Sequence, residues 1–159
     1  MSKALFATIF FLNLFVSAFG QNKVDALIHK PFGYACDLEM VQSKLRGKVK
    51  EKKPVENPHA DGVVDTVTLY GKGKNELAIY EGKYNTFCYG LELHSKKWQL
   101  ESDLQIGMDR AEFLKAFPKA IKESEIRYKL FDSDRVDWAI IEFNRRERVS
   151  AVFLGFYID

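Results

Sequence analysis

The feature that most constrains the fold is a series of short segments in which apolar and polar residues alternate. These segments follow one another from residue 63 onward, and glycine, asparagine or aspartate stands in several of the intervals between them. A period of two places one apolar face on a sheet, and short intervals join neighbouring strands as hairpins. The sequence therefore predicts an antiparallel meander, with strands at residues 63–70, 76–81, 84–94, 96–101, 125–131, 135–144 and 149–159.

Three of these segments carry further information. In 84–94, the alternation puts the row from Phe87 to Leu93 on one face and Cys88 on the other. In 135–144, the apolar residues change phase, which indicates a β-bulge or two covered faces. The last segment, 149–159, is apolar on both faces, and this predicts a central strand that is covered by helix.

One short helix interrupts the predicted meander, in the stretch "LQIGMDRAEFLKAFP". Asp109 is a favourable N-cap, and Glu112 three residues later completes a variant of the capping box. Phe113 and Phe117 form an apolar face, and Pro118 ends the helix. A second short helix is possible at residues 35–45. The predicted class is therefore α+β, an antiparallel meander sheet with one or two short helices packed on one face.

The first twenty residues predict a secretory signal peptide. Lys3 supplies the positive start, an apolar run follows, and the segment closes on small residues up to Gly20. The apolar run is shorter than the ~20 residues that a membrane span needs, so an uncleaved anchor is the weaker interpretation. We therefore expect residues 1–20 to be removed, residues 21–159 to form a single domain, and the protein to be periplasmic or secreted. No transmembrane segment is expected after cleavage.

Cys36 and Cys88 are the two cysteines of the chain. Exported proteins mature under oxidising conditions, so an even number of cysteines predicts a disulfide bond between them. A bond that closes a loop of about 50 residues stabilises the fold by about 4 kcal/mol in the chain-entropy model. Two buried thiols are the alternative.

A row of basic residues precedes the predicted meander, with cations at every second position. This period of two predicts a strand with one wet, basic face. Lysines on an exposed edge strand discourage pairing with another chain, and this is the plainer explanation. The alternative is a docking surface for an anionic partner such as lipid headgroups. The row consists of Lys44, Arg46, Lys48, Lys50 and Lys52.

We find no motif for a catalytic, metal or cofactor site. The histidines and cysteines show no spacing typical of zinc ligands. Asp132, Asp134 and Asp137 lack the further ligands of a calcium loop, so a hairpin turn whose aspartates bond their own backbone is the better interpretation. A set of aromatic residues either lines a ligand groove or, as is commoner, packs within the sheet. That set is Tyr80, Tyr84, Phe87, Tyr89 and Trp98.

The helix stretch also resembles the signature of domains related to beta-lactamase inhibitory protein. A similar motif marks the small lipoprotein subunit of the bacterial outer-membrane assembly machine, and small secreted proteins of Bacteroidota share the architecture. The resemblance implies an exported, non-catalytic protein that binds through a sheet surface. The matching residues are Ile106, Gly107, Met108, Asp109, Glu112, Phe113, Phe117 and Pro118.

The function predicted from sequence is an exported, non-catalytic binding or interaction module of the bacterial cell envelope. Its partner is an unidentified protein or envelope component. The balance of acidic and basic residues gives no reason to expect a nucleic-acid partner. Two alternatives remain, a small envelope hydrolase with an unrecognised site and a lipocalin-like carrier of an apolar ligand.

Overall fold

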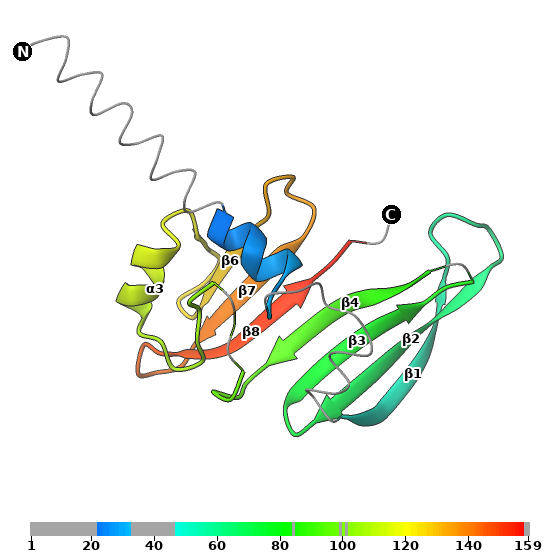
Figure 1. Ribbon diagram of the computed structural model, residues 1–159, viewed down its shortest axis with the longest axis horizontal. Helices are drawn as coiled ribbons and strands as arrows, with labels where there is room; N and C mark the ends of the chain where they lie inside the picture. Colours follow the sequence, from blue (N-terminus) through cyan, green and yellow to red (C-terminus); the bar gives the residue numbers. More distant parts are fainter. Residues whose placement is uncertain (1–21, 33–46, 84, 99, 101, 158–159) are drawn as a thin grey trace, which may run out of the picture.

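The computed structural model describes residues 22–32, 47–83, 85–98, 100 and 102–157. Within them, one antiparallel sheet has the strand order β1-β2-β3-β4-β8-β7-β6-β5 (Figure 1). β1 and β5 are therefore the edges of an open sheet. The strands are β1 Lys48–Glu56, β2 Val64–Lys72, β3 Asn75–Glu81, β4 Thr86–Leu93, β5 Ile121–Lys122, β6 Arg127–Phe131, β7 Trp138–Phe143 and β8 Val149–Gly155.

The predicted α+β class is wrong, because the fold is mostly β. Of the described residues, 46% lie in strands and 13% in helices. The helices are α3, at Arg110–Ala116, and a helix at residues 22–29, which the sequence analysis did not identify. Each is about two turns long, so together they cover part of the sheet without forming a layer of their own. The possible helix at 35–45 lies outside the described residues.

Both helices contribute to a core on one face of the sheet. Leu27 and Ile28 of the N-terminal helix are fully buried in the same apolar cluster as Phe113 of α3 and Phe117, its C-cap residue. The Phe113 ring lies 5.4 Å from the ring of Phe143 on β7. Figure 1 shows the helices near β6, β7 and β8, whereas β1, β2 and β3 extend beyond them. Neither helix is long and apolar enough to cross a membrane.

Asp109 takes the N-cap position of α3, as predicted, but its side chain makes no capping hydrogen bond. The N–H of Arg110 instead donates to the carbonyl oxygen of Glu147 at 2.8 Å. The carboxylate of Asp109 lies 3.4 Å from Nε of Arg148, and Glu112 is exposed. The hairpin before β8 therefore supplies an acceptor for the first N–H group of α3, whereas the predicted side-chain cap does not form.

A bulge in β4 reverses the predicted orientation of Cys88. Ala78 pairs with Gly90 and Ile79 pairs with Cys88, so Tyr89 is the extra residue of the bulge. Cys88 consequently shares the core face with Leu91 and is 6% exposed. Cys36 lies outside the described residues, so its disulfide bond with Cys88 stays a prediction.

Two other strand predictions have opposite outcomes. The predicted central position of β8 is confirmed, because β8 pairs with β4 on one side and β7 on the other. The predicted strand at 96–101 is wrong for its described residues, 96–98 and 100. Its first residues form a turn, in which the N–H of Trp98 donates to the carbonyl of Ser95 at 3.2 Å. The ring of Trp98 packs against the ring of Phe32, with the two ring centroids 5.3 Å apart, so the side chain contributes to the core from a turn.

Candidate functional site

A row of small residues crosses the sheet on the face that the helices leave uncovered. Pairing aligns Ala78 of β3 with Gly90 of β4, and Gly90 with Gly155 of β8. Their neighbours Leu77 and Leu91 point into the core on the other side. Of these three residues only Ala78 has a side chain, a single methyl group. The sheet surface is therefore recessed here, and larger side chains surround the recess.

These residues form the floor of a groove of about 640 Å³. Ligand sites in proteins commonly have volumes of this order. Among the described lining residues, Glu56 is the only carboxylate, and the rest are apolar residues and tyrosines. The lining comprises Val55, Glu56, Pro58, Val67, Ala78, Tyr80, Tyr89, Gly90, Val136, Trp138, Leu154, Gly155, Phe156 and Tyr157.

Trp138 of β7 closes one side of the floor. Trp138 pairs with Gly155, and a Cβ atom at Gly155 would lie 2.2 Å from Cζ2 of the indole. The indole therefore rests directly on the glycine backbone, and any other residue at 155 would displace it. This contact gives the groove a flat aromatic wall.

The opposite wall contains Tyr80, whose hydroxyl donates a hydrogen bond to Oδ2 of the buried Asp65. Asn57 Nδ2 donates to the same oxygen at 2.7 Å. The hydrogen bond to Asp65, the burial of the ring and the negative charge of Asp65 together raise the pKa of Tyr80 to about 12. Tyr80 is therefore a neutral phenol at physiological pH. It fixes the wall in place and is unsuited to act as a base.

The rim of the groove is unusually apolar for an exposed surface. Tyr89 is 42% exposed, Val136 47% and Tyr157 64%. Isolated exposed apolar residues are common, but a contiguous group around a concave apolar floor marks an interaction site. Tyrosine and tryptophan are also the residues that contribute most often to binding hot spots.

The aromatic residues singled out in the sequence divide between the two faces. Tyr80 and Tyr89 line the groove, and Phe87 stacks on Tyr80 with ring centroids 4.9 Å apart. Trp98 packs on the helix side, and Tyr84 lies outside the described residues. Sequence reasoning missed the floor. Its only local signal was a glycine within a strand pattern, which often marks close approach to the backbone.

The predicted basic face does not form on β1. Lys50 is the residue skipped at a bulge between Val49 and Glu51, so alternation breaks there. Lys48 pairs with Gly71 on the groove face, whereas Lys52 pairs with Thr68 on the core face. Lys44 and Arg46 lie outside the described residues.

Lys50 is also engaged within the sheet. Its Nζ lies 2.5 Å from Oε1 of Glu76, and its stem crosses over Gly71 to reach it. β1 is an edge strand, so the explanation by edge protection fits the described lysines better than an anion-binding surface.

The aspartates before β7 bond backbone N–H groups through one oxygen each. Asp132 Oδ1 accepts from the N–H of Val136 at 2.9 Å, within its own turn. Asp137 Oδ1 accepts at 2.7 Å from the N–H of Tyr157, a residue that follows β8. Asp134 is exposed. The predicted turn is thus present, and two of its carboxylates also position residues of the groove rim.

Comparison with known proteins gives one partial similarity. No protein-family model matches the chain, and no solved structure matches it. The chain is 33% identical over 134 residues to the human (Homo sapiens) F-actin monooxygenase MICAL1, over 84% of this chain and 12% of that protein. The chain thus spans about an eighth of the length of this relative. What the fold and groove define is a mostly β domain with an open sheet and an apolar groove on one face.

Proposed function

We propose that this protein is a non-catalytic binding module that takes an apolar loop of a partner protein into the groove. The observation that carries the proposal is the combination of a floor of small residues with an exposed aromatic rim. An apolar side chain inserted between Trp138 and Tyr80 would reach Gly90 and displace water from both rings. Burial of such a side chain contributes roughly 1.5–3 kcal/mol.

A protein partner fits this groove better than a carried apolar ligand. A lipocalin-like carrier encloses its ligand in a closed barrel. In the described residues the sheet is open, with β1 and β5 as its ends, and the rim residues Tyr89 and Tyr157 stay exposed. Exposed aromatic side chains around a pocket are what a partner surface would cover.

The cellular setting belongs to the same proposal. The signal-like residues 1–20 and the resemblance to beta-lactamase inhibitory protein support an exported module of the cell envelope, periplasmic or secreted. The activity named for MICAL1 is not carried over, because the similarity covers 12% of that protein.

The proposal can be tested by filling the floor of the groove. Gly90→Val adds a side chain whose Cβ would lie 3.4 Å from the Leu154 carbonyl and 3.9 Å from Ala78, both tolerable contacts. Tyr157→Ala removes part of the rim. The matched control is Ile121→Ala, which removes a similarly exposed apolar residue, 55% exposed, from the distant edge strand β5.

The assay is capture from an envelope extract, followed by binding of each purified captured protein to the variants. We expect one partner that binds wild type and Ile121→Ala alike, and that binds Gly90→Val and Tyr157→Ala at least tenfold more weakly. Circular dichroism and melting temperature verify that the variants fold. A partner that binds folded Gly90→Val as tightly as wild type would show that the groove is not the binding site.

A further inference from the structure

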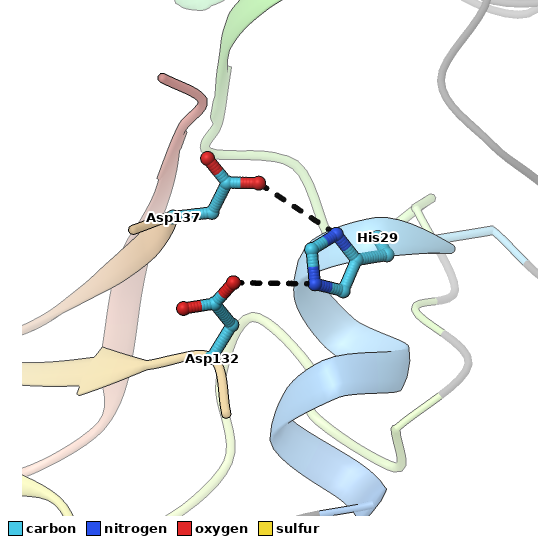
Figure 2. A group of neighbouring side chains, drawn as sticks. All are labelled: His29, Asp132 and Asp137. Carbon is cyan, nitrogen blue, oxygen red and sulfur yellow. Dashed lines mark ion pairs between the residues drawn. The ribbon is translucent and has the colours of Figure 1, made fainter. Parts of the chain in front are cut away.

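Three donor side chains from distant parts of the sequence converge beside the N-terminal helix (Figure 2). His29 lies at the end of helix 22–29, and Asp132 and Asp137 lie between β6 and β7. His29 Nε2 is 3.4 Å from Asp132 Oδ2, and His29 Nδ1 is 3.6 Å from Asp137 Oδ2. The side chain of Asp132 is only 3% exposed. Taking one donor atom from each residue, all three atoms lie within 4.8 Å of one another.

The spacing of these atoms is too long for hydrogen bonds. Charge-assisted N–H···O bonds measure about 2.7–2.9 Å. In this same protein, His94 Nε2 and Glu92 Oε1 are 2.5 Å apart and form a hydrogen bond, whereas His29 forms none with either aspartate. A neutral imidazole also has only one N–H and so could donate to one of the two carboxylates at most.

The two carboxylates need a positive charge between them. The Oδ1 atoms are occupied by backbone N–H groups, so the Oδ2 atoms are available. In the part of the chain that the structure describes, their only ion-pair partner is His29. Burying a carboxylate such as Asp132 without a compensating cation is costly. A metal ion bound between the two carboxylates would balance their charge.

We propose that His29, Asp132 and Asp137 bind one divalent transition-metal ion of the Zn²⁺ class. One imidazole nitrogen and two carboxylate oxygens are donors that Zn²⁺ accepts, with bonds of about 2.0–2.2 Å. Donors at that distance around a four-coordinate ion lie roughly 3.3 Å apart. The separations of 3.4 and 3.6 Å run to different nitrogens of His29, and one ion would take only one of them. With one donor atom taken from each residue, all three lie within 4.8 Å of one another, so a small side-chain rotation brings them around one ion. Two carboxylates and one dication give a neutral site, and water takes the fourth position on the half-exposed side of His29.

The position of the site gives the ion a structural role. Asp132 and Asp137 use their other oxygens to hold the backbones of Val136 and Tyr157, which both lie on the groove rim. An ion bound to all three side chains would therefore tie helix 22–29 to that rim. The inference does not depend on what the groove binds, because metal affinity is measured on the protein alone.

The test uses the purified full chain after chelator treatment, at pH 7.5, titrated with ZnCl₂ and separately with CoCl₂. We expect one equivalent of Zn²⁺ in isothermal titration calorimetry. Saturation should raise the melting temperature by about 5–10 °C. Co²⁺ should give the visible absorption of a four-coordinate ion. His29→Asn and Asp137→Asn should lose at least tenfold in affinity, and Asp137→Asn keeps an oxygen for the Tyr157 N–H.

The matched control is His94→Asn. His94 directly follows β4 and pairs with a single carboxylate, that of Glu92 in β4. His94→Asn should bind Zn²⁺ like wild type. Wild type that binds no Zn²⁺ overturns the proposal. So does binding that survives in His29→Asn.

Discussion

Truncation of Phe113 should destabilise the fold more than any other change in α3. The Phe113 side chain is 0% exposed, and its ring lies 5.3 Å from Phe117, 5.7 Å from Tyr128 and 5.4 Å from Phe143. Phe113→Ala removes a whole ring from this cluster, and two edge-on pairs are lost with it. Phe→Ala at such a site costs about 3–5 kcal/mol, because the cavity adds to the lost transfer energy. We expect the upper half of that range, since each aromatic pair adds about 0.5–1.5 kcal/mol.

The matched control is Leu114→Ala, one residue further along α3. Leu114 is 37% exposed, so its truncation should cost less than about 1 kcal/mol. Both values are measured by urea unfolding, followed by tryptophan fluorescence and extrapolated linearly to water. Equal losses in the two variants would refute the reasoning, because they would mean that α3 is not anchored by one aromatic face. A loss below about 1 kcal/mol for Phe113→Ala would do the same.

Three further outcomes are expected. Asp109→Ala should change the free energy of unfolding by less than about 0.5 kcal/mol in urea unfolding, because its side chain makes no capping hydrogen bond; a loss above about 1 kcal/mol would show that it does cap α3. Ultraviolet titration should find one tyrosine that ionises last, near pH 12, and Tyr80→Phe should remove it. Because the folded-state pKa of Tyr80 is raised, the neutral phenol contributes stability below about pH 10, and this is lost as the pH rises toward 12. Thiol titration of the denatured, unreduced exported protein should detect no thiol if Cys36 and Cys88 are bonded, and two thiols would exclude that bond.

Local patterns in the sequence determined where most of the secondary structure lies. Alternation located β2, β3, β6, β7 and β8, because a strand with one buried face must repeat every second residue. Apolar residues on both faces identified β8 as central. The start of α3 followed from Asp109, which takes the N-cap position, and its end from Pro118, which disfavours helix at the residue before it.

Tertiary contacts decided what these patterns do not carry. The bulges at Tyr89 and Lys50 depend on how each strand pairs with its neighbour, and one extra residue reverses every orientation after it. The acceptor for the first N–H group of α3 is the carbonyl of Glu147, on a hairpin distant in sequence. The class is mostly β and not α+β because the two described helices are each about two turns long, whereas eight strands pair in one sheet.

Both candidate sites belong to this second category. The floor of the groove needs Ala78, Gly90 and Gly155 to be neighbours across three strands, which only the pairing register achieves. His29 meets Asp132 and Asp137 because the N-terminal helix packs on the opposite end of the chain. A short motif records residues that are close in sequence. Side chains that a sheet brings together are far apart in the sequence and form no motif. For that reason the sequence predicts where the strands and helices lie, whereas both sites depend on the tertiary structure.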